Sequence, residues 1–341
     1  MAVVDLRSDT FTKPTPAMRA AMAAAEVGDD VWGEDPTARV LEERAADILG
    51  KDAALFVPSG TMANQIALLV HCRPGDEVIV GRGAHTRLYE SGAGAAWAGV
   101  QFAEVGGADG TFTGDDVEAA ALPADRNLPR TRLIAVENTH NRGGGRVWPR
   151  AQLDAVAARA RARGLALHLD GARIWNAAVA SGIPERELAA PFDTVSACFS
   201  KGLGAPVGSV IAGGRDDVER ARRFRKMLGG GMRQVGVLCA AALYALEHHR
   251  GRLAEDHANA RRLADGLAGV AGVTVDPARV ETNIVIFEVT GIPSAELARR
   301  TEASGVRLHA IAPTRLRAVT HLDVDAAGID RAIAAVRASL A

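Results

Sequence analysis

Short apolar runs recur along the first two thirds of the chain and alternate with longer amphipathic stretches. The runs are AALFV (53–57), DEVIV (76–80), LIAVEN (133–138), LALHLD (165–170), TVSACFS (194–200) and GSVIAGG (208–214). Runs of this length, ending in polar or glycine residues and separated by helical patterns of about 10 to 20 residues, are typical of crossover units in a mostly parallel sheet. The pattern predicts an α/β domain flanked by helices, whose ligand lies beyond the carboxyl ends of the strands.

The rhythm changes after a helical pattern over residues 232–268. The segments that follow it, NIVIFEV, SAELARRTEASG, VRLHAI, LRAVTH and a closing alanine-rich helix, form a separate α+β pattern. A chain of 341 residues also exceeds the size at which one hydrophobic core usually keeps growing. We therefore expect a large domain over residues 1–252, including the N-terminal segment, and a small C-terminal α+β domain over residues 253–341.

Composition and charge narrow the class of ligand. The formal net charge of −1 gives no long-range field that would gather nucleic acid or an anionic membrane, so we expect a small-molecule ligand, no nucleic acid and no membrane. The cysteines and histidines show no spacing typical of a disulfide framework or a metal site, and none is predicted. The start of the chain lacks a signal-peptide layout and no apolar run is long enough to span a bilayer, which predicts a cytoplasmic location.

An acid and an amine stand at the ends of two of the apolar runs. Asp170 ends LALHLD and Lys201 follows SACFS, and each precedes a glycine that lets the chain turn away. If the two strands are neighbours, both side chains face one crevice. Pyridoxal 5'-phosphate (PLP) requires this pair, because its aldehyde binds a lysine amine and its ring nitrogen needs a carboxylate to stay protonated. Each residue alone has an ordinary interpretation, as a strand-end acid or a surface charge. Lysine is scarce in this chain, however, and together the two favour a cofactor site.

Two further segments suit a cofactor. In VPSGTMANQIALLV (57–70) a strand runs through Gly60 and Thr61 into an apolar helix, a junction whose free N–H groups can bind a phosphate or can simply form an N-cap. His85 follows DEVIV and could lie against a cofactor ring, or be an ordinary core or surface histidine. Neither a dinucleotide fingerprint nor a P-loop is present.

Eight sequence blocks carry a family resemblance, and they occur in order from Asp5 to about Asp323. They are LRSDTFTKPTPAM, VGDDVWGEDPT, SGTMANQIAL, ENTHNRGGGRV, HLDGARIWNA, SKGLGAPVGS, RKMLGGGMRQ and AVTHLDV. Together they resemble the low-specificity L-threonine aldolases, which are fold-type-I PLP enzymes. The resemblance implies an enzyme that cleaves L-threonine, L-allo-threonine and related β-hydroxy-α-amino acids to glycine and an aldehyde.

The resemblance also implies roles for individual residues. Lys201 would hold PLP as a Schiff base, Asp170 would pair with the pyridine nitrogen, and His85 would stack on the ring. Gly60 and Thr61 would hold the phosphate. The remaining positions are the carboxylate clamp Ser8, Arg173 and Arg317, with Arg173 also near the ring hydroxyl, and Arg233, which would reach the phosphate from a neighbouring subunit.

This last role implies a homo-oligomer, a dimer or a homotetramer, with active sites between subunits. For the base that takes the β-hydroxyl proton, His85 is the first candidate, since an unperturbed pKa of about 6.5 suits proton transfer near neutrality, and His140 is the second. For both arginines of the clamp, a structural ion pair is the alternative.

Two positions depart from the family pattern on the substrate side. Asn127 stands where members often carry a histidine, and Trp32 replaces the tyrosine of the usual VYG. Asparagine cannot serve as a base near neutral pH, and tryptophan lacks the hydroxyl, so we expect an altered side-chain preference at this substrate-binding surface. A PLP-dependent β-eliminating lyase, an aminotransferase and a non-catalytic PLP-binding protein are the alternative functions.

Overall fold

The computed structural model describes residues 3–341, and its main element is a seven-stranded sheet. In spatial order its strands are β2 (Ala53–Val57), β8 (Ser209–Gly213), β7 (Thr194–Cys198), β6 (Ala166–Gly171), β5 (Thr131–Glu137), β3 (Glu77–Gly81) and β4 (Gln101–Val105). Strand β8 runs antiparallel to both of its neighbours, and all other adjacent pairs are parallel. Because β2 and β7 both oppose β8, the carboxyl ends of the six remaining strands share one edge of the sheet.

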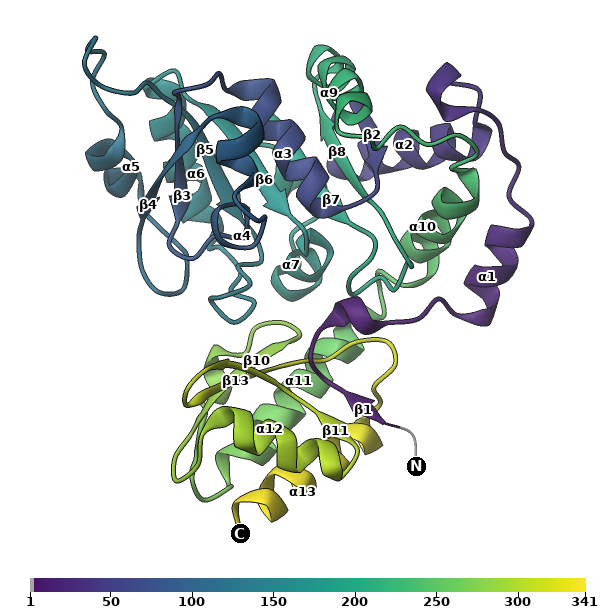
Figure 1. Ribbon diagram of the computed structural model, residues 1–341, viewed down its shortest axis with the longest axis vertical. Coiled ribbons are helices and arrows are strands. Elements are labelled where there is room, and N and C mark those ends of the chain that lie inside the picture. Colours follow the sequence, from purple (N-terminus) through teal and green to yellow (C-terminus); the bar gives the residue numbers. More distant parts are fainter. Residues whose placement is uncertain (1–2) are drawn as a thin grey trace.

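Helices cover both faces of this sheet (Figure 1). One face carries α3 (Gly60–His71) and α9 (Arg215–Met227), and the opposite face carries α2 (Pro36–Leu49), α6 (Arg150–Ala162) and α7 (Ile174–Ser181). The other elements of this part are α1 (Pro16–Ala23), α4 (His85–Leu88), α5 (Gly114–Ala120), α8 (Glu185–Ala189), α10 (Gly236–His248) and the short segments η1 (Asp9–Phe11), η2 (Asp30–Trp32) and η3 (Gly94–Ala98).

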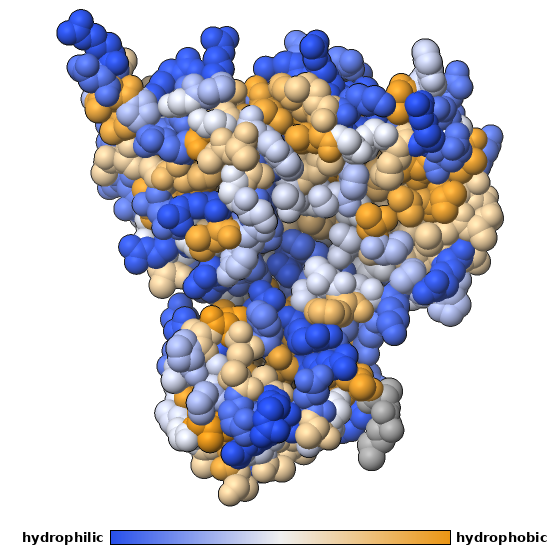
Figure 2. Space-filling model, in the orientation of Figure 1, coloured by the Kyte–Doolittle hydropathy of each residue, from blue (hydrophilic) through white to orange (hydrophobic). Residues whose placement is uncertain are grey.

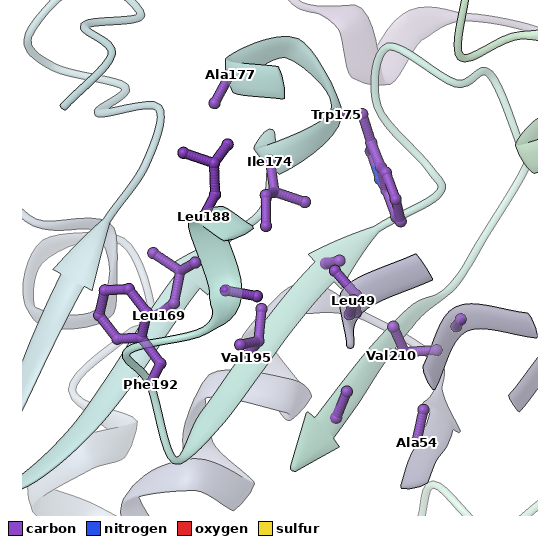
Figure 3. Packing of buried hydrophobic residues seen from close by; sticks show 14 of the residues in the cluster. Leu49, Ala54, Leu169, Ile174, Trp175, Ala177, Leu188, Phe192, Val195 and Val210 are labelled. Atoms are coloured by element: carbon purple, nitrogen blue, oxygen red, sulfur yellow. The ribbon is translucent and has the colours of Figure 1, made fainter. Parts of the chain in front are cut away.

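The core lies between the sheet and these helices. Strand residues alternate between the two faces, and since both faces are covered, both sets are apolar. Figure 3 shows Leu169, Val195 and Val210 of three neighbouring strands packed near Leu49 of α2 and Leu188 of α8. Full burial of such a side chain contributes about 1.5–3 kcal/mol. Because both faces of the sheet are covered by helices, the sequence shows continuous apolar runs instead of an alternation of apolar and polar residues.

The C-terminal part contains a four-stranded antiparallel sheet in the order β12 (His309–Ala312), β13 (Arg315–Val319), β10 (Ile284–Val289) and β9 (Val273–Thr274). It packs with α11 (Leu253–Ala268), α12 (Ser294–Ala303) and α13 (Ala326–Leu340), and η4 (Pro277–Arg279) precedes β10. Strand β1 (Val4–Asp5), at the start of the described chain, pairs in parallel with β11 (Val306–Arg307). The N-terminal segment therefore lies against the C-terminal part of the molecule (Figure 1).

The predicted architecture, a mostly parallel sheet flanked by helices plus a smaller α+β part, is confirmed. The pattern missed the edge strand β4, whose residues Gln101 and Glu104 are exposed, because only a buried strand gives a continuous apolar run. It could not show that β8 is antiparallel, since burial and not direction determines its composition. No helix within residues 3–341 has the length and apolar character needed to cross a membrane.

Candidate active site

A cavity of about 290 Å³ opens at the edge where the parallel strands end, facing β12 and β13 of the smaller sheet. Six of the residues predicted for the site line this cavity: Ser8, His85, Asp170, Arg173, Lys201 and Arg317. On the face drawn in Figure 2, the hollow between the upper and lower parts of the molecule is lined mainly by hydrophilic and intermediate residues. The cavity therefore suits a charged, polar ligand.

Asp170 lies near the end of β6, and Lys201 lies in the turn three residues after the neighbouring strand β7. Asp170 is buried, and its two carboxylate oxygens accept hydrogen bonds from Asn64 Nδ2 at 2.8 Å and Ala172 N at 3.1 Å. Burial alone would raise the pKa of Asp170, but the nearby positive charges of His85 and Lys201 outweigh it and lower that pKa. Within residues 3–341, Lys201 Nζ has no hydrogen-bond or ion-pair partner. An ionised acid and a free amine thus face one space.

His85 begins α4, and its orientation is fixed from two sides. Its backbone N–H donates to Glu137 Oε2 at 2.7 Å, and its Nδ1 lies 3.0 Å from Glu90 Oε1. Burial by itself would lower the pKa of His85, but the Glu90 hydrogen bond and the Asp170 charge overcome this and raise it. Since a carboxylate only accepts, Nδ1 carries the hydrogen, and Nε2 is left for proton transfer.

The predicted phosphate residues stand at the end of β2 but do not line this cavity. Helix α3 begins at Gly60 because Ser59 Oγ accepts from Met62 N at 3.2 Å, which leaves the first N–H groups of the helix without helical acceptors. A Cβ on Gly60 would lie 2.8 Å from Cys198 Sγ. Ser209 Oγ is buried nearby without a partner in the described chain. Unpaired donors therefore gather where only a glycine fits.

The two arginines of the cavity have different partners. Arg173 is buried and forms a double hydrogen bond with Asp9, with both distances 2.7 Å. Burial opposes the ionisation of Asp9, yet the charge and hydrogen bonds of Arg173 lower the pKa of Asp9 well below its usual range. The structural ion pair considered for Arg173 is therefore present, and it occupies two of its three nitrogens.

Arg317 has no acidic partner within residues 3–341. Its Nη1 donates to Asn141 Oδ1 at 2.9 Å and its Nη2 to Arg7 O at 3.2 Å, whereas its buried Nε has no acceptor. Burial and the neighbouring Arg173 lower the pKa of Arg317. Beside it in the cavity, Ser8 Oγ accepts from Thr10 N and Thr10 Oγ1, so its own hydrogen is free to donate. This is a place for a carboxylate ligand.

Besides Gly60 and Thr61, four predicted residues do not line the cavity. His140 is fully buried, and its Nδ1 accepts from Gly143 N at 3.0 Å. Trp32 is 77% exposed, Arg233 is an exposed residue paired with Asp29 at 2.9 Å, and Asn127 is exposed in the loop before β5. The single chain does not bring these four residues to the ligand space.

Sequence reasoning missed several polar residues that shape the site. They are Asp9, Asn64, Glu90, Glu137 and Asn141. Asn64 and Glu90 left a usable signal: two adjacent amides, Asn64 and Gln65, within the mainly apolar α3, and a carboxylate five residues after His85. Asp9 left none, because its partner Arg173 is 164 residues away.

The sequence was also compared with known families. The family model described as beta-eliminating lyase matches residues 5–290. This chain belongs to that family, among the low-specificity L-threonine aldolases. The low specificity L-threonine aldolase of Escherichia coli K12 is 46% identical over 340 residues, which cover 99% of this chain and 100% of the relative. The low-specificity L-threonine aldolase 1 of Arabidopsis thaliana is 47% identical over 328 residues, 94% of this chain and 92% of the relative.

Solved structures agree on the fold. The Leishmania major threonine aldolase superposes with a TM-score of 0.84 at 21% identity and covers 99% of this chain and 100% of its own. The serine palmitoyltransferase of Sphingomonas wittichii superposes with a TM-score of 0.78 at 18% identity, over 99% of this chain and 87% of its own. The expected fold, that of fold-type-I PLP enzymes, is confirmed.

Proposed function

We propose that this protein uses PLP to cleave L-threonine, L-allo-threonine and related β-hydroxy-α-amino acids to glycine and an aldehyde. The observation that carries the proposal is one cavity lined by a buried acid, a free lysine amine and an arginine without an acidic partner, Asp170, Lys201 and Arg317. The threonine aldolase relatives at 46–47% identity support it over nearly the whole chain.

The residues present fit PLP. Lys201 would bind its aldehyde carbon as a Schiff base, Asp170 would face its ring nitrogen, and His85 would lie on its ring. The phosphate would meet the unpaired donors at Gly60 and Thr61 and the buried Ser209 Oγ. When bound, PLP supplies an electron sink for the bond that breaks at the α-carbon.

The carboxylate clamp determines which bond breaks. Arg317 and Ser8 offer unused donors to the substrate carboxylate, and Arg173, fixed by Asp9, keeps one nitrogen toward the cavity. A substrate held by its carboxylate would be fixed in rotation about its N–Cα bond. This orientation would select the Cα–Cβ bond for cleavage, and the cofactor would supply the electron sink.

His85 is the proposed base. Its Nε2 would take the β-hydroxyl proton as the aldehyde leaves, while Glu90 on Nδ1 keeps the ring in the required tautomer. His140 remains the second candidate, because it is fully buried and does not line the cavity, although its Nε2 lies 3.7 Å from Oε2 of the cavity residue Glu137.

The assembly and its location complete the proposal. Arg233, Trp32 and Asn127 are exposed in the single chain, which fits residues that act at the cavity of a neighbouring subunit in a homodimer or homotetramer. We further propose a cytoplasmic protein whose large domain spans residues 1–252 and whose small domain spans residues 253–341. In this division strand β1 of the large domain packs on the small one.

A substrate panel tests the function. PLP-loaded protein is incubated with L-threonine, L-allo-threonine and L-phenylserine, and glycine and the matching aldehyde are measured. Equal amounts of both products are expected. Ammonia and a keto acid would instead indicate the β-elimination that the family model's description names, and turnover that requires a keto-acid acceptor would indicate an aminotransferase. Either result would overturn the proposal.

A further inference from the structure

A single amide side chain, that of Asn64, is hydrogen-bonded both to Asp170 and to Glu90, the carboxylate partner of His85. Asn64 lies on the buried face of α3 and is only 2% exposed. Its Nδ2 donates to both Asp170 Oδ2 and Glu90 Oε1, each at 2.8 Å. Its Oδ1 accepts from Ser196 Oγ at 2.8 Å and lies 3.2 Å from His168 Nε2. All four hydrogen-bonding positions of the amide are therefore used.

The two carboxylates fix the orientation of this amide. Both can only accept when ionised, so the NH₂ group must face them and the carbonyl oxygen must face His168. His168 is fully buried, and desolvation lowers its pKa to about 4, so its ring is neutral near pH 7. Its Nε2 must then carry the hydrogen that Asn64 Oδ1 accepts, which leaves its Nδ1 as an acceptor.

The same reasoning fixes the hydrogen positions as far as His71, the last residue of α3. His168 Nδ1 lies 2.9 Å from Thr194 Oγ1, which donates its hydrogen there. The hydroxyl oxygen then accepts from Nε2 of His71, also at 2.9 Å. Every donor from His71 through Thr194, His168 and Asn64 thus points toward the cavity. We call these four residues and Asp170 the directed chain.

We propose that Asn64 is a positioning residue that, as the junction of the directed chain, holds the carboxylates of Asp170 and Glu90 side by side through its two N–H donors. Two buried carboxylates that share a site normally cannot both ionise, and one takes up a proton. The shared NH₂ group donates to each of them, which favours the ionised form of both and reduces this competition. As a consequence, one amide would position both the carboxylate that faces the cofactor's ring nitrogen and the carboxylate that is hydrogen-bonded to His85. The cofactor part of this inference rests on the proposed function, whereas the directed chain itself does not.

Holoenzyme variants separate positioning from packing. Asn64→Leu removes the donor to both carboxylates, while the matched variant Gln65→Leu, also buried on α3, removes a donor to Glu90 alone. A hydrogen bond to a charged group is worth about 1.5–3 kcal/mol, so Asn64→Leu should weaken PLP binding and lower kcat by roughly 10- to 100-fold with KM little changed. Gln65→Leu should shift the pH profile of kcat and leave PLP affinity unchanged. Equal effects of the two variants on PLP affinity, measured by absorbance titration, would overturn the proposal.

A milder variant keeps the test valid if leucine at position 64 prevents folding. His168→Phe keeps an aromatic ring at this position but removes the donor that fixes the amide of Asn64. A neutral hydrogen bond contributes about 0.5–1.5 kcal/mol, so PLP affinity should fall by roughly 2- to 10-fold. An affinity unchanged by His168→Phe would show that the chain behind Asn64 has no role.

The apoprotein gives a readout that needs no cofactor. Asn64→Asp places a third carboxylate, which cannot donate when ionised, against Glu90 and Asp170, with His168 beside it and His85 and Lys201 beyond them. The pKa of such a carboxyl is raised in the folded state, which then binds more protons than the unfolded chain. The melting temperature of the Asn64→Asp variant should therefore fall further below that of wild type as the pH rises from about 5 to 8.

A deficit that is the same at both pH values would overturn the directed chain. Wild-type protein that binds no PLP, or releases no glycine from threonine, would instead overturn the proposed function and leave this readout intact.

Discussion

At the residue scale, the charged groups of the cavity differ chiefly in whether another protein group already satisfies them. Arg173 is paired with Asp9, and Asp170 and Glu90 share the amide of Asn64. Lys201 and Arg317 have no such charged partner in the described chain. Because an unpaired buried or half-buried charge is costly, these two residues are the ones best explained by a ligand.

Lys201→Ala should abolish the covalent attachment of PLP. Since no other amine lines the cavity, the long-wavelength absorbance of the lysine-linked cofactor should disappear and turnover should drop severely. Absorbance spectra after PLP addition and desalting measure this, with Lys13→Ala, an exposed lysine, as the control. An unchanged band in the Lys201 variant would mean that another lysine holds the cofactor.

Arg317→Leu should weaken substrate binding without releasing PLP. The loss of charge-assisted hydrogen bonds to the substrate carboxylate, about 1.5–3 kcal/mol, predicts a fall in kcat/KM of roughly 10- to 100-fold, mainly through KM. Steady-state kinetics with L-threonine measure it. Arg315 lies on the same strand as Arg317 and forms an exposed ion pair with Glu288 of β10, so Arg315→Leu should have little effect. A normal KM in the Arg317 variant would contradict the clamp.

Glu90→Gln should change the pH dependence of activity. In the wild type the Glu90 hydrogen bond raises the pKa of His85, so the basic form needed for proton transfer accumulates only as pH rises. A neutral amide removes that charge, and the acid limb of the kcat/KM profile should move to lower pH, with a lower maximum because the base is weaker. Glu104→Gln, which affects an ion pair with Arg87, is the control. A profile that does not move would exclude His85 as the base.

At the element scale, the junctions at the carboxyl ends of the strands do most to build the site. Asp170 lies next to the last residue of β6, and Lys201 follows the end of β7 by three residues. Strand β3 leads into His85, and β2 leads into α3. The sequence pattern predicted these junctions because apolar runs and glycine turns are local signals. It did not predict β4, whose exposed residues interrupt the apolar pattern, nor the direction of β8.

Gly60→Ala tests the junction of β2 and α3. The new Cβ would lie 2.8 Å from Cys198 Sγ, so the first turn of α3 must shift and its N–H groups must move with it. We expect a stability loss of about 1–3 kcal/mol and weaker PLP binding. Removing the sulfur with Cys198→Ala in the same chain should recover part of both, in a double-mutant cycle. Gly251→Ala, whose Cβ would have no neighbour within 4 Å, is the control. Strictly additive effects would contradict the steric explanation.

At the scale of the whole molecule, the buried Asp9 joins three regions that are distant in sequence. It lies in the N-terminal segment, binds Arg173 beyond β6, and accepts from Asn283 Nδ2, before β10, at 3.2 Å. Together with the β1–β11 pairing, this cluster connects the main sheet to the smaller sheet across the cavity.

Asp9→Asn should therefore destabilise the protein in a pH-dependent way. Removal of one partner from a buried ion pair costs about 3–5 kcal/mol near neutral pH. Because the folded pKa of Asp9 is depressed, its contribution is present above the unfolded pKa of about 3.9 and is lost as pH falls below it. The difference in unfolding free energy between variant and wild type should shrink at acid pH. Asp265→Asn, at an exposed position, is the control. A difference independent of pH would contradict the ion-pair assignment.

The sequence by itself determined the alternation of strands and helices, the smaller α+β part, and the presence of an acid, an amine and a histidine at strand ends. These follow from local periodicity and from the fact that parallel strands end at one edge. Only the tertiary structure decided which groups satisfy one another: Asp9 with Arg173, and Asn64 with an aspartate 106 residues away. Such pairings depend on the packing of whole elements, and a buried polar group shows its partner only when the chain has folded around both.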